Sequence, residues 1–434
     1  MHASACAASS WSFRTERLYL RPHVTLHRLY LTPGMFGFGK LATYDYFAHV
    51  ERALKRRFDD AGKKLESFVV DVAPTASIRR RAVRLAELVA ATSGNDGGPI
   101  HVLGHSTGGL DARLVACPSA RLPTTKEKLE WLPRLASVTT MSTPHYGTPL
   151  ASFFATVSGQ RMLYAVSALT FIGLSLGAPP LAAASTLVVA VGRIDRALGV
   201  ELRVIDRTTD ALLKALEPAT SDTVRAYLDA IQRDQGAVIQ LTPEAMDLFQ
   251  AGVEDRPGTL YQCTCAMAPP PSPGKLAKNF MSPWRALSST LFTTLYSITS
   301  RYDERYPCAA ADAGEEMEAA LEKAFGRAPG ARANDGVVPT RSQLWGKIAW
   351  AGYADHLDVL GHYPGNEAPV PFYKSWFRSK ARAAEPPQEI VGAVPDPDAD
   401  AKHVDWLLSG SNFNDDAFAK LMDGIAAGML RSKE

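Results

Sequence analysis

Short apolar runs alternate with amphipathic segments over residues 1–150 of the chain. The apolar runs have the length of buried strands and lie at 26–31, 66–72, 99–103 and 135–141. The segments between them place apolar residues three and four positions apart, which predicts helices at 44–61, 78–91 and 110–116. Because strands that alternate with helices form parallel sheets covered on both faces, we expect an α/β fold.

The pattern changes near residue 151. The run 162–192 contains no charged side chain, and Pro179 and Pro180 divide it into two pieces. Each piece is shorter than the ~20 residues that a membrane span requires, and proline interrupts a helix. We therefore predict an apolar helical hairpin that serves as a cap, in preference to a transmembrane segment.

After residue 192 the pattern of apolar and polar residues predicts both helices and strands. It predicts helices at 210–216, 221–232 and 243–252, a strand at 259–266, a mostly helical stretch at 275–327, a last strand at 347–353 and a terminal helix that begins near Asn414. We expect three parts: residues 1–150 form the first half of the core, 151–255 the inserted cap, and 256–434 the second half of the core. The proline-rich, acidic stretch 384–400 is expected to be a surface excursion.

One short motif suggests chemistry. The segment 104–109 reads Gly-His-Ser-Thr-Gly-Gly and lies between a predicted strand and a predicted helix. A Gly-x-Ser-x-Gly sequence in this place is typical of a nucleophile elbow, a sharp turn that lifts the serine hydroxyl clear of the sheet. Strand and helix backbones meet so closely at such a turn that Gly104 and Gly108 leave no room for side chains. Ser106 is therefore the candidate nucleophile.

A serine nucleophile needs a base to accept its proton, and the base needs an acid to orient it. Asp335 lies in the tight turn Asn334-Asp335-Gly336, and His356 follows the last predicted strand. Ser106, Asp335 and His356 thus stand in the order nucleophile, acid, base. We expect His105 to point away from the nucleophile, whereas His362 and His403 stay open as alternative bases.

Five segments in this order resemble those of the bacterial true lipases, the triacylglycerol lipase-like family of the α/β-hydrolase superfamily. They are the glycine-rich loop 33–38 with 44–47, the elbow 104–113, the strand and loop 138–148, the acid turn 334–336 and the histidine segment 356–358. Residues 151–240 and 365–411 match loosely or not at all. The resemblance implies an α/β-hydrolase fold, with a mostly parallel sheet, helices on both faces and an inserted helical cap or lid.

The same resemblance implies a lipase or esterase of lipid metabolism that cleaves carboxylic esters through an acyl-enzyme. The backbone N–H groups of Met35 and Thr107 would form its oxyanion hole, and the apolar cap would bind the acyl chain of a lipid or acyl ester. Pro33 departs from the family, which has histidine there, so another contact must hold this loop. Two alternatives stay open: an acyltransferase or thioesterase with the same triad, and a non-catalytic, membrane-associated binding protein of this fold.

The family also has a structural calcium, and the resemblance implies Asp358 and Asp312 as its ligands in this chain. His362 stands where a neutral oxygen ligand is expected, and calcium prefers oxygen. The sequence thus leaves a structural calcium open, and the triad itself requires no cofactor.

Charge argues about the partners of this protein, and cysteine content about its disulfides and metal sites. The 47 lysines and arginines balance 45 acidic residues, which argues against a nucleic-acid partner. The densest basic cluster, Arg79-Arg80-Arg81 with Arg84, predicts a solvated helix face. Five scattered cysteines favour neither a disulfide framework nor a zinc site.

The first residues carry no signal-peptide pattern, so we expect a cytoplasmic protein. The uncharged run 162–192 leaves open a transient contact with a membrane or lipid interface, and so a membrane-peripheral location. Nothing in the pattern indicates an oligomeric state.

Overall fold

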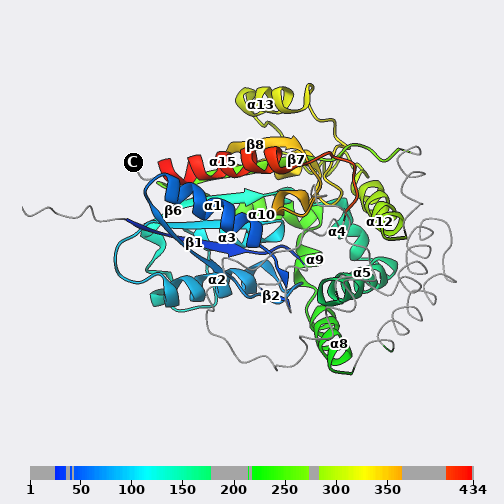
Figure 1. Cartoon of the computed structure of the whole chain (residues 1–434), viewed down its shortest axis with the longest axis horizontal. Coiled ribbons are helices and arrows are strands. Elements are labelled where there is room, and N and C mark those ends of the chain that lie inside the picture. Colours follow the sequence, from blue (N-terminus) through cyan, green and yellow to red (C-terminus); the bar gives the residue numbers. More distant parts are fainter. Residues whose placement is uncertain are drawn as a thin grey trace, which may run out of the picture.

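Six parallel strands form the centre of the molecule, in the order β4-β1-β5-β6-β7-β8 (Figure 1). The computed structural model describes residues 25–35, 40–41, 44–176, 214, 218–272, 283–363 and 407–432. The strands are β1 (Leu26–Thr32), β4 (Lys64–Val69), β5 (Ile100–His105), β6 (Leu135–Met141), β7 (Leu260–Met267) and β8 (Lys347–Tyr353). A short antiparallel pair, β2 (Lys40–Leu41) and β3 (Tyr44–Asp45), lies between β1 and the first helix in the sequence. The expected α/β class, with a parallel sheet and helices, is confirmed.

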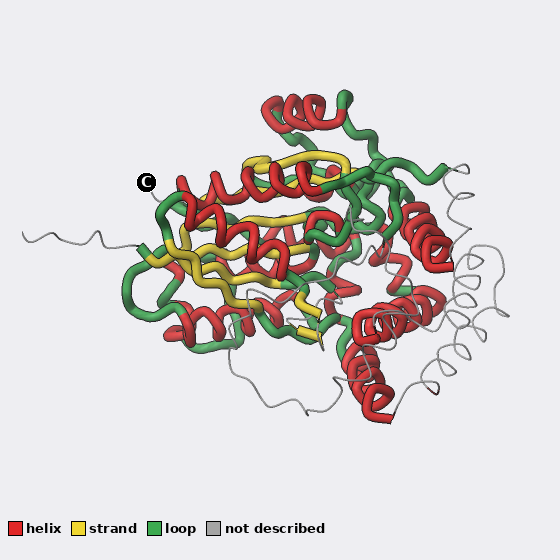
Figure 2. Tube along the Cα trace, viewed as in Figure 1, coloured by secondary structure: helices red, strands yellow, loops and turns green. Residues whose placement is uncertain are grey.

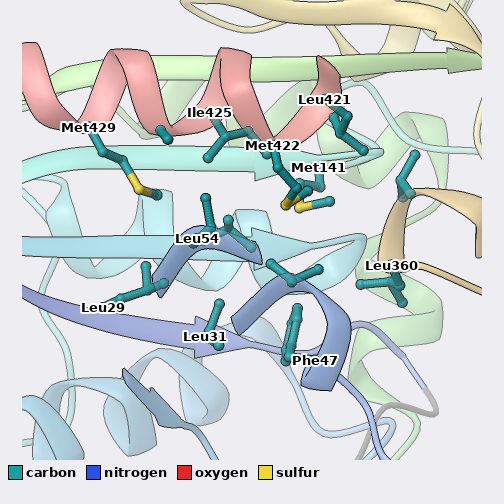
Figure 3. Packing of buried hydrophobic residues seen from close by; sticks show 14 of the residues in the cluster. Leu29, Leu31, Phe47, Leu54, Met141, Leu360, Leu421, Met422, Ile425 and Met429 are labelled. Atoms are coloured by element: carbon teal, nitrogen blue, oxygen red, sulfur yellow. The ribbon is translucent and has the colours of Figure 1, made fainter. Parts of the chain in front are cut away.

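Helices cover both faces of this sheet. On one face α1 (Ala48–Asp60) and α15 (Asp415–Arg431) pack together over Leu29 and Leu31 of β1 (Figure 3). On the other face α2 (Ile78–Thr92) and α3 (Thr107–Ala116) cover Tyr30. Because successive residues of a strand point to opposite faces and both faces are buried, β1 is apolar at every position from 29 to 31.

The described helices between β6 and β7 are α4 (Pro149–Phe154), α5 (Val157–Leu176), α8 (Pro218–Arg233), α9 (Gly236–Gln240) and α10 (Pro243–Gly252). Helices α4, α5, α8 and α9 lie beyond the end of the sheet to which the strands point (Figures 1 and 2). Helix α10 packs against α3, where its Met246 shares a buried cluster with Leu110. Thr242 caps α10 by accepting a hydrogen bond from the N–H of Ala245, and Pro243 begins the helix, as the sequence indicates. None of the helices in the described ranges combines the length and the apolar character needed to cross a membrane.

Several expected segments lie outside the described residues. The predicted hairpin coincides with α5 up to Leu176, and residues 177–192 are not described. The same holds for most of the predicted helix 210–216 and for the excursion 384–400.

Two helices occupy most of the described part of the stretch 275–327. They are α12 (Pro283–Thr299) and α13 (Glu315–Phe325), and residues 300–314 form a loop between them. The prediction of a mostly helical stretch is confirmed for the described residues, and this loop interrupts it. Pro307 lacks a helical N–H donor, and Gly314 has φ +80°, so neither fits the inside of a helix. Strands β7 and β8 extend the sheet begun by β1, β4, β5 and β6, so residues from both ends of the chain share one sheet.

Candidate active site

Ser106 lies in the turn between β5 and α3 and has φ +54° and ψ −127°. Such a backbone conformation is strained for a residue with a side chain and is common at functional sites. The Ser106 N–H donates to the carbonyl oxygen of Met141 at 2.8 Å, and its own carbonyl accepts from Gly109 at 3.1 Å. The turn is therefore held from β6 as well as from its own helix.

The glycines of the motif are required by close backbone contacts. A Cβ atom on Gly104 would overlap the backbone of Gly108, and one on Gly108 would overlap the carbonyl oxygen of Thr32. The strand β5, the helix α3 and the end of β1 thus approach as closely as the sequence motif indicates. This contact brings the loop after β1 to the serine.

Asp335 precedes β8 in the sequence and His356 follows it, and their side chains form a buried pair. Nδ1 of His356 lies 2.8 Å from Oδ2 of Asp335. The other oxygen of Asp335, Oδ1, accepts from the N–H groups of Val337 at 2.9 Å and Val338 at 2.7 Å. Because a carboxylate only accepts hydrogen bonds, Nδ1 carries the proton and Nε2 keeps a lone pair.

The pair lies beside the elbow. The ring of His105, the residue before Ser106, has its centroid 4.6 Å from that of His356. Nε2 of His105 also lies 2.9 Å from the carbonyl oxygen of His356. Ser106 and His356 keep only 7% and 6% of their surfaces exposed, so both lie in a largely water-excluded place.

The loop after β1 passes directly over Ser106. A Cβ atom on Gly34 would lie 3.3 Å from the Ser106 Oγ, so Gly34 borders the hydroxyl, and Met35 is the next residue of this loop. Thr107 is the first residue of α3, and the first N–H groups of a helix have no partner within that helix. The N–H groups of Met35 and Thr107 thus belong to the two backbone segments that flank Ser106.

Arg81 of α2 holds this loop at Pro33. Its guanidinium donates to the carbonyl oxygen of Pro33 and, through Nε, to Oδ2 of Asp111 at 2.8 Å. The hydroxyl of Thr32 donates to the same Asp111 oxygen at 3.3 Å. Arg81 and Asp111 are fully buried, and burial raises the pKa of Asp111 to about 6 although Arg81 opposes the rise. Sequence reasoning missed this role, because an arginine in a basic run gives no sign of a buried partner.

Comparison with solved structures gives several similar chains. No protein-family model and no curated protein matches this sequence. EstA from Clostridium botulinum has 17% sequence identity and a TM-score of 0.43, covering 82% of this chain and 86% of that chain. Lipase 1 from Pelosinus fermentans has 15% identity and a TM-score of 0.43, covering 83% and 100%. The Staphylococcus hyicus lipase has 16% identity and a TM-score of 0.40, covering 82% and 97%.

The residues implied as calcium ligands have other partners. Oδ2 of Asp358 accepts from the N–H of Asp355 at 2.8 Å and from the hydroxyl of Ser411 at 2.7 Å. Asp312 is exposed and accepts from the N–H of Gly314 at 2.8 Å. Among the described residues, no group of three or more His, Cys, Asp or Glu side chains is arranged to hold a metal ion. A structural calcium stays a prediction, and no step below uses it.

The other histidines have different surroundings. His145 is fully buried between Arg113, whose guanidinium lies 3.2 Å from Nδ1, and the Thr140 hydroxyl. Burial, with the charge of Arg113, holds the pKa of His145 well below its usual range. The ring of His362 packs edge-on against that of His49, with centroids 5.6 Å apart. His403 lies outside the described residues.

Proposed function

We propose that this chain is a serine hydrolase that cleaves carboxylic esters, with lipid or acyl esters as its substrates. The observation that carries the proposal is the buried pair of Asp335 and His356, held against a strained elbow that presents Ser106. A nucleophile, a base and an acid are the three groups that acyl transfer through a serine requires.

In the first half of the reaction, the Ser106 Oγ attacks the ester carbonyl carbon and gives its proton to Nε2 of His356. The carbonyl π electrons move to oxygen, which forms a tetrahedral intermediate. Asp335 keeps the imidazole in the correct tautomer and stabilises its positive charge. The intermediate then re-forms its carbonyl group, and the bond between the carbon and the alcohol oxygen breaks. His356 gives the proton to this leaving oxygen, so the products are an alcohol and an acyl-enzyme.

In the second half, water takes the place of the alcohol. His356 accepts a proton from the water as its oxygen attacks the acyl carbon, and then protonates the Ser106 oxygen as that bond breaks. The products are a carboxylic acid and the free enzyme. No cofactor takes part in either half.

The oxyanion of each intermediate would accept hydrogen bonds from the N–H groups of Met35 and Thr107. The contact between Gly34 and Ser106 supports the first assignment, and the place of Thr107 at the start of α3 supports the second. Each donor of this kind is worth about 3–4 kcal/mol of transition-state stabilisation in known cases.

The apolar region 162–192 would bind the acyl chain and contact a lipid interface. Its described part belongs to α5, where Met162 and Leu163 are buried. Helices α4 and α5 lie beyond the strand ends where the Ser106 turn is located (Figure 1).

A fluorophosphonate probe tests the nucleophile. We expect the intact protein to react covalently and Ser106→Ala to remain unlabelled, because the probe forms its bond with an activated serine. Ser142→Ala is the matched control, since Ser142 is also buried and has φ +46° but follows β6 instead of β5. Intact protein that labels no better than Ser106→Ala would refute the proposal.

Product analysis then separates hydrolysis from acyl transfer. With a nitrophenyl ester in water we expect the free carboxylic acid, and an added alcohol should compete only weakly for the acyl group. A product that is mainly the new ester would instead identify an acyltransferase with the same triad.

A further inference from the structure

A chain of hydrogen bonds connects the loop over Ser106 with the turn that carries His356. The N–H of Gly34 donates to the hydroxyl of Tyr46 at 3.4 Å, and that hydroxyl lies 2.7 Å from Nδ1 of His105. Nε2 of His105 lies 2.9 Å from the carbonyl oxygen of His356. Tyr46 immediately follows β3, and His105 is the last residue of β5. Four separate segments of the chain are therefore joined next to the serine.

The protons of this chain have one consistent arrangement when His105 is neutral. A carbonyl oxygen only accepts, so Nε2 of His105 must carry the proton that it donates to His356. Nδ1 then has a lone pair and accepts the Tyr46 O–H, and a lone pair of that hydroxyl accepts the Gly34 N–H. Every polar atom in the chain has a partner of the right kind.

The surroundings keep His105 neutral. It is 1% exposed, and burial together with the neighbouring His356 holds its pKa well below the usual range. Burial also raises the pKa of Tyr46, so the hydroxyl keeps its proton. The Tyr46 ring meets that of Phe47 edge-on with centroids 4.8 Å apart, and the His105 ring packs against that of His356 with centroids 4.6 Å apart.

We propose that Tyr46 and His105 are positioning residues, which hold the oxyanion loop and the His356 turn at a fixed separation on either side of Ser106. Tyr46 acts on the peptide that precedes Met35, and His105 acts on the backbone of the base. Neither side chain exchanges a proton with substrate. The role rests on the proposed ester hydrolysis, because it matters only if Met35 and His356 act on the same intermediate.

Tyr46→Phe tests this role, because it removes one oxygen atom and keeps the ring. We expect kcat to fall about 10- to 100-fold, since small displacements of catalytic groups have effects of this size. KM should change less than about threefold, because the contact serves the transition state more than substrate binding. The Gly34 amide, having lost its acceptor, should exchange with solvent deuterium faster than in the intact protein.

His105→Gln and His105→Leu test the other end of the chain. Glutamine keeps an N–H donor near the His356 carbonyl and should retain more activity than leucine, which keeps none. In a double-mutant cycle, Tyr46→Phe combined with His105→Leu should lose less activity than the sum of the single losses, because each breaks the same chain.

Tyr30→Phe is the matched control. The Tyr30 hydroxyl is also hydrogen-bonded, at 2.9 Å from the Thr92 hydroxyl, but it faces α2. We expect this variant to keep wild-type kcat and KM.

The possible failures are distinguishable. Active wild-type enzyme with unchanged kcat in folded Tyr46→Phe and His105→Leu overturns the positioning role alone. Wild-type protein that neither reacts with a fluorophosphonate nor hydrolyses esters overturns the proposed function, and the positioning role with it.

Discussion

At the scale of single residues, Arg81 differs most from its expected role. The basic run 79–84 predicts a solvated helix face, and Arg80 fits this prediction with 73% of its side chain exposed. Arg81 is instead fully buried against Asp111 and the Pro33 carbonyl, so the prediction is wrong for this residue. Successive residues of a helix point about 100° apart. One arginine of a consecutive run therefore faces the sheet. The ion pair of Arg81 with Asp111 on α3 offsets the cost of burying its charge.

Arg81→Met should strongly destabilise the protein. The substitution leaves Asp111 buried without its ion-pair partner, which costs about 3–5 kcal/mol in comparable cases. Ester hydrolysis should fall as well, because the loop loses its anchor at Pro33. Urea unfolding at pH 7 measures the first effect, and initial rates on a nitrophenyl ester measure the second.

Two variants control this prediction. Arg80→Met removes an exposed ion pair with Asp234 and should cost less than about 1 kcal/mol. The double variant Arg81→Met/Asp111→Leu should recover much of the stability, because no unpaired charge remains, but it should not recover activity. Full activity in a stable double variant would exclude a role of Arg81 in holding the loop.

At the scale of elements, the junction of β1, β5 and α3 determines where the serine lies. Gly108 touches the carbonyl oxygen of Thr32 at the end of β1, so α3 can begin only where β1 ends. The local pattern predicts this junction well, because the glycines, the strand and the helix are contiguous in the chain. Helix limits are predicted less well: α1 begins at Ala48 rather than at Tyr44, because residues 44 and 45 pair as β3.

Gly108→Ala should damage the elbow. Its methyl group would overlap backbone atoms of Thr32 and Pro33, which cannot move without shifting β1. We expect a loss of about 3–5 kcal/mol, in the range of severe core substitutions, and loss of fluorophosphonate labelling. Gly252→Ala, at the end of α10, is the control: its Cβ meets no atom within 4 Å. Equal stability of the two variants would contradict the proposed close contact.

At the scale of the whole molecule, buried polar side chains connect strands across the sheet. Nδ1 of His27 on β1 lies 2.9 Å from Nε2 of His101 on β5, and Nδ1 of His101 lies 2.8 Å from the Ser137 hydroxyl on β6. Burial, with a smaller contribution from Lys63, lowers the pKa of His27 from 6.5 to about 4. The folded sheet therefore excludes a proton that the unfolded chain accepts.

This histidine should make stability depend on pH. Between pH 6.5 and pH 4 the unfolded state binds the proton and the folded state does not, so the free energy of unfolding falls as the pH falls. A pKa difference of this size corresponds to a loss of up to about 3 kcal/mol at pH 4. Urea unfolding at pH 7, 5.5 and 4.5 should show a steeper decline for wild type than for His27→Gln. Identical declines would show that His27 does not titrate in this window.

Much of the fold follows from local pattern. Apolar runs and helical spacing predict all six strands of the sheet within a few residues, and β6 and β8 at their observed ends. The Gly-x-Ser-x-Gly motif also predicts the close backbone contacts at Gly104 and Gly108, where a side chain would not fit. Segments such as 300–314, where proline and glycine interrupt a weak pattern, are predicted less well because their shape depends on neighbours.

The sequence by itself determined the α/β class, the elbow and the chain order of Ser106, Asp335 and His356, since these depend on periodicity and on contiguous residues. Only the tertiary structure brought Asp335 to 2.8 Å from His356, buried Arg81 against Asp111, and joined Tyr46 to His105. Those contacts connect residues far apart in the chain. Their energies depend on distance, burial and available partners, and packing of the sheet and its helices sets all three.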